Sequence, residues 1–152
     1  MNNKGKDVRL YNALFPLWFI LLFPPMWLIV LPGNFIIDSL VLIISMLILK
    51  VADKKQLYKK CILKIFGFGL LADAAGSAFM FLMVALGVGR MGDESYLTLP
   101  ALILSSFLIF KLNYSITFKE IETKIRYKLS LIFAIVTAPY TFLVPSSWLY
   151  YH

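Results

Sequence analysis

The stretch Gly67-Phe-Gly-Leu-Leu-Ala-Asp73-Ala-Ala-Gly76-Ser77-Ala-Phe-Met80 places one carboxylate at the centre of a long apolar run. At the centre of a transmembrane helix an aspartate costs about 2.5 to 3.5 kcal/mol of insertion free energy. The surrounding Leu, Ile, Phe and Val residues supply roughly 3 to 6 kcal/mol in the opposite direction, so the segment still inserts. An acid that is present in a membrane helix despite this insertion cost indicates either a functional site or a buried contact between helices.

Small residues surround Asp73 within two helical turns. Ala72 and Gly76 are four residues apart, a spacing that lets two membrane helices approach closely. Gly69, Asp73 and Ser77 follow one another at i, i+4 and i+8 and therefore share one helix face. We predict that Gly69, Ala72 and Gly76 pack against neighbouring helices and that Asp73 and Ser77 point into the protein.

The composition of the whole chain is that of a membrane protein. Of 152 residues, 61% are hydrophobic, and the mean hydropathy is +0.82, whereas soluble domains are roughly 45 to 50% apolar. The apolar runs approach the roughly 20 residues that cross a bilayer as a helix, and they do not alternate as barrel strands do. We predict an all-α integral membrane protein, a single five-helix transmembrane domain over residues 1–152. Its spans are expected at about 11–31, 33–50, 62–88, 98–116 and 129–149.

Basic residues lie almost entirely on one side of this predicted topology. The net charge is +7, and all of the 15 Lys and Arg residues except Arg90 precede the first span or fill the second and fourth connections. We expect a multi-pass protein of the plasma membrane. The positive-inside rule then places its N-terminus in the cytoplasm and its C-terminus outside the cell. Because basic residues beside a membrane act as topology signals or contact anionic lipid, we expect the bilayer, and not nucleic acid, as the partner.

Prolines interrupt three places in the predicted bundle. Pro24 and Pro25 lie inside the first span and Pro139 lies inside the fifth, so both helices are expected to kink. Pro32-Gly33-Asn34 reads as a tight external turn between the first two spans.

The second predicted span carries a polar stripe. Asn34, Asp38 and Ser45 fall close to one helix face. With a turn at residues 32–34, Asp38 lies near a helix N-terminus, where the helix dipole favours an anion. Asp38 is then nearer the outer surface than Asp73, by roughly 5 to 10 Å at 1.5 Å per residue. Two carboxylates at different depths are better explained as two successive binding positions for an ion or proton than as one catalytic pair.

Two connections carry further expectations. Asp53 with Gln56 resembles a capping box that starts a helix near Lys54. Residues 117–128 are predicted to form a helix rising out of the membrane, with i, i+4 pairs from Glu120 to Lys124 and from Glu122 to Arg126. The polar residues Ser106 and Asn113 of the fourth span, and Ser130, Thr137 and Thr141 of the fifth, are expected to face the interior.

The sequence offers no pattern for catalysis or for a resident metal or cofactor. It has no phosphate-binding glycine loop, no HExxH, no GxSxG and no dinucleotide fingerprint. It has one cysteine, Cys61, and one histidine, His152, the last residue. We therefore expect a protein that is not an enzyme and has no metal site.

Two functions fit these residues. The first is a channel or an ion- or proton-coupled transporter, with Asp73 as the intramembrane binding site and Asp38, Ser77, Asn34 and Ser45 along the route. The second is a non-catalytic accessory subunit that binds a partner membrane protein through the small-residue face around Asp73. Because five helices enclose little space, we expect a homo-oligomer or assembly with another membrane protein.

Overall fold

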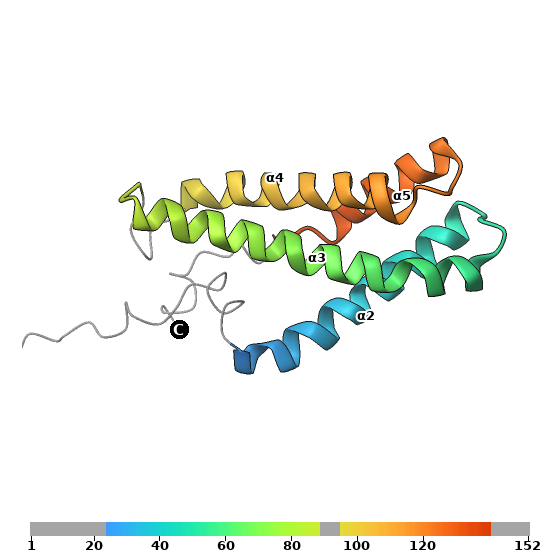
Figure 1. Cartoon of the computed structure of the whole chain (residues 1–152), viewed down its shortest axis with the longest axis horizontal. Coiled ribbons are helices and arrows are strands. Elements are labelled where there is room, and N and C mark those ends of the chain that lie inside the picture. The colour runs from blue at the N-terminus through green and yellow to red at the C-terminus, as the bar shows by residue number, and fades with distance from the viewer. Residues whose placement is uncertain (1–23, 89–94, 141–152) are drawn as a thin grey trace, which may run out of the picture.

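The computed structural model describes residues 24–88 and 95–140, and every regular element in these ranges is helical. In chain order they are α2 (Pro24–Ile48), α3 (Lys54–Ala85), α4 (Ser95–Leu112), the π-helical segment η2 (Asn113–Thr117) and α5 (Thr123–Val136). Figure 1 shows α3 and α4 side by side, while α2 crosses α3 and diverges from it toward its own N-terminus. The all-helical class is confirmed.

Three of these helices are long and apolar enough to cross a membrane. They cover Trp27–Ile48, Lys54–Ala85 and Tyr96–Thr117. Large apolar side chains point outward along them, for example Leu28, Leu63 and Ile103, each with more than half of its surface exposed. Such surfaces are costly in water and favourable against lipid, so the fold is compatible with a membrane protein. The count of five helices is not confirmed.

The predicted turn at Pro32-Gly33-Asn34 is wrong, because α2 runs through it as one helix of 25 residues. Pro32 deletes one backbone hydrogen bond, but a proline inside an apolar helix is tolerated where neighbours cover the freed carbonyl. Residues 24–31 and 33–48 therefore belong to one span and not to two. Pro24 and Pro25 lie in the first turn of α2 and not in the middle of a helix, and residues 11–23 lie outside the described part of the chain.

Both α2 and α3 end in a left-handed residue that closes the helix. At the end of α3, Gly87 has φ +75°, and the amides of Gly87 and Val88 donate to the carbonyls of Val84 and Met83. These two hydrogen bonds together form a Schellman motif. The same pattern ends α2, where Lys50 has φ +50° and Val51 donates to Met46.

The connection from α2 to α3 is short, and α3 begins at Lys54 as predicted. The predicted capping box does not form, because the Asp53 side chain makes no hydrogen bond to the helix start. From Lys54, α3 continues through the predicted third span to Ala85. The predicted external loop, including Arg90, falls largely outside the described residues.

The predicted helix over residues 117–128 is wrong for residues 118–122, whereas residues 123–128 are helical and belong to α5. The helical segment η2 ends at Thr117, the chain reverses, and α5 begins at Thr123. Phe118 is fully buried and its ring lies 6.1 Å from that of Phe133. Burial of this side chain at the start of the turn outweighs the surface charge pairs that favoured a continuous helix, since exposed pairs contribute little.

The predicted kink at Pro139 is also wrong, because α5 ends at Val136, before the proline is reached. A residue that precedes proline disfavours helical backbone, and Thr137 closes the end with a 2.8 Å hydrogen bond from its Oγ1 to the carbonyl of Phe133. The rest of the predicted fifth span, residues 141–149, lies outside the described residues.

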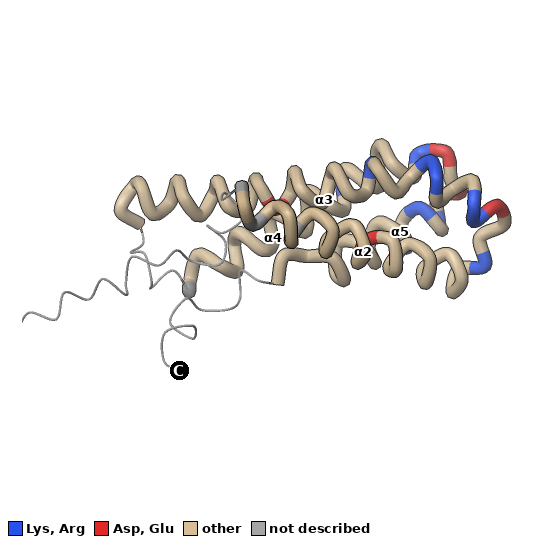
Figure 2. Tube along the Cα trace, turned by 90° about the horizontal axis from the view of Figure 1, so that it is seen from below, with Lys and Arg blue, Asp and Glu red and all other residues tan. Residues whose placement is uncertain are grey.

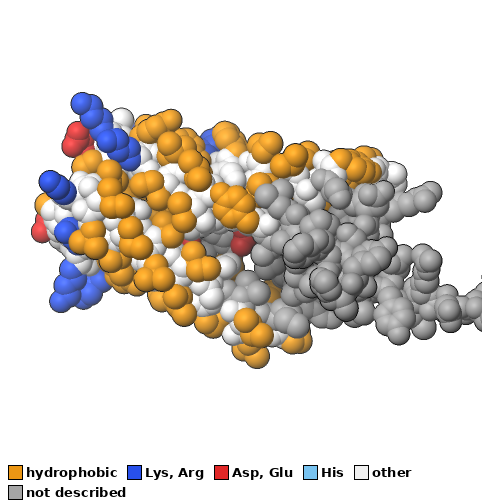
Figure 3. Space-filling view, turned by 180° about the vertical axis from the view of Figure 1, so that it is seen from behind, with side chains coloured by type: hydrophobic (Ala, Val, Ile, Leu, Met, Phe, Trp, Pro, Cys, Tyr) orange, Lys and Arg blue, Asp and Glu red, His pale blue; other side chains and the backbone are white. Residues whose placement is uncertain are grey.

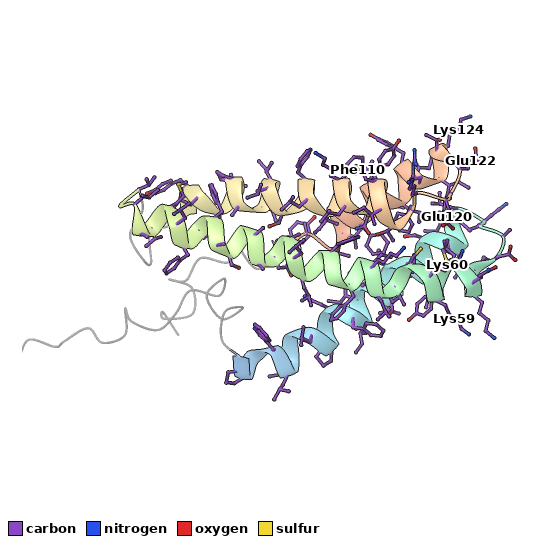
Figure 4. The ribbon with its side chains drawn as sticks, in the orientation of Figure 1. Lys59, Lys60, Phe110, Glu120, Glu122 and Lys124 are labelled. Atoms are coloured by element: carbon purple, nitrogen blue, oxygen red, sulfur yellow. The ribbon has the colours of Figure 1, made fainter. Side chains whose placement is uncertain are left out.

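The basic residues of the described chain gather at one end of the bundle, where the α2–α3 and α4–α5 connections lie (Figure 2). Lys60 of α3 and Glu120 of the second connection form an ion pair of 3.3 Å there. Figure 4 shows these two side chains reaching toward each other. We refer to this as the basic end. Its position on the cytoplasmic side, and with it the orientation of the chain, stays a prediction.

Two clusters of apolar side chains hold the helices together. The larger joins α2, α3, α4 and α5 near the basic end, with Phe118, Phe133 and Leu129 fully buried. The smaller joins Met80 of α3 to Leu97 and Ala101 of α4 at the opposite end. Between these clusters, α2 and α3 carry the acidic residues.

Candidate functional site: an acidic pocket between three helices

The α2 side of the pocket comes from one turn of its inner face. Asn34 and Asp38 stand four residues apart, Asn34 half-buried and Asp38 5% exposed. Because α2 is continuous, Asp38 lies near its middle, about 21 Å from Pro24 and about 15 Å from Ile48 at 1.5 Å per residue. The interpretation of Asp38 as a carboxylate stabilised by a helix N-terminus is therefore wrong.

The α3 side of the pocket faces the α2 side, and the two helices run antiparallel. Asn34 donates a hydrogen bond of 3.4 Å from Nδ2 to Oδ2 of Asp73. One turn toward the basic end, a Cβ added to Gly69 would lie 3.6 Å from Oδ2 of Asp38. Four residues forward on α2 thus correspond to four residues back on α3, and Gly69 stands opposite the carboxyl group of Asp38.

This register reverses the predicted order of the two acids. Asp38 lies about one turn, or about 6 Å, nearer the basic end than Asp73. The prediction placed it farther from that end, because the supposed turn at residues 32–34 shortened α2. The two acids are offset along the bundle, but both line the same space between α2 and α3.

That space is a pocket of about 360 Å³, and we call it the acidic pocket. The end of α5 and the residues after it close its third side. Figure 3 shows acidic atoms at the surface away from the basic end, with hydrophobic side chains nearby. The pocket is lined by Gly33, Asn34, Ile37, Asp38, Gly69, Asp73, Val136, Thr137, Ala138, Pro139 and Tyr140.

Two predicted site residues are buried elsewhere. Ser45 is 2% exposed and lies nearly two turns beyond Asp38, outside the pocket lining. Ser77 is fully buried one turn beyond Asp73, also outside the lining, and its Oγ has no hydrogen-bond partner in the described part of the chain. The structure therefore brings Asn34, Asp38 and Asp73 together, and it does not bring Ser45 or Ser77 to them.

The small residues of α3 serve two interfaces and not one. Gly69 faces Asp38 of α2. Ala72 is fully buried, and its carbonyl accepts a hydrogen bond of 2.9 Å from Ser105 Oγ of α4. Gly76, one turn further along, is also buried. Because α3 lies between α2 and α4, small side chains on two sides of it allow both neighbours to approach.

Sequence reasoning missed several residues that matter here. Pro139 and Tyr140 line the pocket although they were read as part of a continuous helix. Ser105 makes the buried contact in α4, whereas Ser106 is half-buried. Asn113 is buried and donates to the carbonyl of Ile109 at 3.0 Å, and α4 contributes nothing to the pocket lining. Buried positions in α4 and η2 recur every fourth residue from Leu97 to Thr117, which places Ser105, and not Ser106, on the buried face.

The chemistry of the pocket is that of two carboxyl groups and one carboxamide inside apolar walls. Within residues 24–88 and 95–140, no three His, Cys, Asp or Glu side chains come close enough to hold a metal ion. Carboxyl groups in such a setting can bind a cation or exchange a proton, and a carboxamide can orient one of them. The fold and the pocket define a small all-helical protein of apolar helices with an acidic site at their centre.

Comparison with protein families, with curated proteins and with solved structures gives no match to this chain. The acidic pocket and its position in the helices are therefore the features that bear on function.

Proposed function

We propose that this protein is a multi-pass protein of the plasma membrane that moves protons or small cations, with the acidic pocket as its binding site. One observation carries the proposal. Asp38 and Asp73 come from the middle of two apolar helices and line one pocket of about 360 Å³. Ionisable groups at such positions are costly, and they commonly mark ion pathways and proton relays.

Two carboxyl groups suit this role better than one. A contact that only joined α2 to α3 would need a single hydrogen bond, and such bonds in membranes contribute about 0.6 kcal/mol on average. A second acid beside Asp73 adds repulsion whenever both groups are charged, and a bound cation or proton relieves it. The volume of the pocket exceeds the roughly 30 Å³ that a water molecule occupies in the liquid, so an ion could enter with water.

Binding fits the pocket better than catalysis. Among the residues that the structure describes, the lining contains carboxyl groups and an amide but no cysteine, histidine or serine that a base could activate as a nucleophile. The hydroxyl of Thr137 is already bonded to the carbonyl of Phe133. We therefore propose transport and no enzymatic activity.

The accessory-subunit function has one observation in its favour. Asp73 is half-buried, and Asp38 is almost fully buried. A partner helix could reach Asp73 from outside the chain and hydrogen-bond it. Under either function we propose that the exposed apolar faces bind lipid or further subunits, in a homo-oligomer or with another membrane protein.

Flux through purified protein in liposomes tests the proposal. Asp73→Asn keeps the shape and the acceptor for Asn34 but removes the charge, so proton or alkali-cation flux should fall at least about tenfold, which corresponds to about 1.4 kcal/mol. Asp38→Asn should act in the same direction. Glu120→Gln, on the exposed surface, is the matched control and should leave flux unchanged.

Two results would contradict the transport function. One is wild-type protein that carries no proton or alkali cation in a correctly inserted preparation. The other is equal flux in wild type and Asp73→Asn. Crosslinking in native membranes that captures one stoichiometric partner through position 73 would instead support the accessory function.

A further inference from the structure

A second hollow lies at the basic end of the α2–α3 pair, away from the acidic pocket. It has a volume of about 240 Å³. We call it the lysine-rimmed groove. Its lining comes from Ile43, Met46 and Leu47 of α2 and from Lys54, Lys55 and Tyr58 of α3.

The groove has an apolar floor and apolar edges. Met46 is 2% exposed and forms the floor, while Ile43 and Leu47 are 42% and 54% exposed and stand at its edge. The hydroxyl of Tyr58 donates a hydrogen bond of 3.0 Å to Ser39 Oγ, one turn before Ile43. This bond holds the Tyr58 ring against α2 as a wall.

The charged rim of the groove continues into a neighbouring open hollow of about 510 Å³. The two share Lys54 and Lys55, and the second adds Gln56, Lys59 and one acid, Asp53. Among the described residues the single ion pair is that of Lys60 with Glu120, so no carboxylate lies within 4 Å of the three lysines around this hollow. Figure 4 shows Lys59 extending outward at this end of α3.

We propose that the lysine-rimmed groove binds one anionic phospholipid. Its acyl chain would lie along the apolar groove, and its phosphate would lie between the ammonium groups of Lys54 and Lys55. Basic pockets between membrane helices are known to hold anionic head groups. The groove is where an apolar helix face meets the lysines, which is the depth at which a lipid changes from chain to head group.

The composition of the site argues for this occupant over others. A soluble anion would be attracted by the lysines but would leave the apolar groove uncovered. An acidic peptide would meet the same apolar wall. A zwitterionic phospholipid would bring its own cation to the lysines, and like charges repel. An amphiphile with a net negative head group matches both the apolar groove and the lysines of its rim.

Spin-labelled lipids in vesicles test the proposal with the full chain. The probes are phosphatidylglycerol and phosphatidylcholine labelled on the acyl chain, and the measurement is the motionally restricted fraction of each. Wild type should prefer phosphatidylglycerol. The double variant Lys54→Gln, Lys55→Gln should lose about 25-fold of this preference, about fivefold for each lysine near the surface.

A matched control separates this site from general surface charge. Lys124→Gln, Lys128→Gln removes the same charge from exposed lysines of α5 that do not line the groove, and it should retain the preference. An equal loss in both double variants would overturn the proposal, because any surface lysine would then serve.

The apolar half has its own variant. Ile43→Trp fills the groove and should weaken phosphatidylglycerol retention, whereas Ile44→Trp, equally lipid-facing but outside the lining, should not. Glycerol 3-phosphate is added as a competitor that carries the head-group phosphate without a chain. Full competition by it, or retention unaffected by Ile43→Trp, would overturn the lipid assignment and leave a simple anion site.

Discussion

At the scale of single residues, the carboxyl group of Asp38 lies beside a glycine of α3. Gly69 stands opposite Asp38, and the space that it leaves open is part of the acidic pocket. An added methyl group would lie 3.6 Å from the carboxyl oxygen, an ordinary contact distance. Position 69 therefore has room for one added carbon.

Gly69→Ala is therefore expected to keep the fold and to raise the free energy of unfolding in detergent by up to about 1 kcal/mol, the helix preference of alanine over glycine. The matched control is Gly67→Ala, since an added Cβ at Gly67 meets nothing within 4 Å. Reversible unfolding followed by circular dichroism measures both. A loss of more than about 1 kcal/mol at position 69 alone would contradict the contact described above.

At the scale of elements, helix ends decide how the chain turns. Both α2 and α3 stop in a Schellman motif, but only α3 has the glycine that this conformation prefers. In α2 the left-handed position is held by Lys50, which costs roughly 1 to 2 kcal/mol relative to a residue without Cβ. The next residue, Val51, packs against the main apolar cluster and holds the turn in place.

Lys50→Gly should accordingly raise the free energy of unfolding by about 1 kcal/mol, and Gly87→Ala should lower it by a similar amount. Lys50→Ala controls for the lost charge, because alanine keeps the strain, and it should change little. Detergent unfolding measures all three. Equal stability of Lys50→Gly and Lys50→Ala would show that the conformation at position 50 stores no strain.

Two sequence signals for elements failed. Pro32-Gly33-Asn34 has turn chemistry, yet α2 continues through it although a proline inside a helix costs about 3 kcal/mol. Residues 117–128 have helical charge pairs, yet the chain reverses at Phe118, which is buried against Phe133 of α5. At this second place a buried contact outweighs charge pairs worth a few tenths of a kcal/mol each.

For the whole molecule, the basic end has a direct consequence for topology. The α2–α3 and α4–α5 connections lie at the same end, and the C-terminal end of α3 lies at the other (Figure 2). If α2, α3 and α4 cross the membrane, both connections face one compartment. The buried native Cys61, 3% exposed, is replaced by serine to give a background without cysteine.

In that background, Gln56→Cys and Thr123→Cys should react with an impermeant maleimide from the same side, and Val88→Cys from the opposite side. All three positions are exposed in the structure. Sealed vesicles of known orientation provide the measurement, and native Cys61 without replacement should stay unlabelled. Labelling of positions 56 and 123 from different sides would contradict the arrangement of the helices.

The sequence by itself determined the class of the protein. Apolar runs of about 20 residues have few folds open to them in lipid, so an all-helical protein with α3 from Lys54 and Asp73 near its middle followed from composition and spacing. It also identified Asn34, Asp38 and Asp73 as the polar residues of interest, because each is costly where it stands.

Only the tertiary structure decided how these residues meet. The antiparallel register of α2 and α3, set by contacts between residues 31 and 39 positions apart, placed Asp38 opposite Gly69 and Asn34 opposite Asp73. The end of α5 then closed the pocket with residues that no local pattern connects to them. The physical reason is that periodicity reports which face of a helix is polar, whereas partner and depth depend on where each helix begins and on what packs against it.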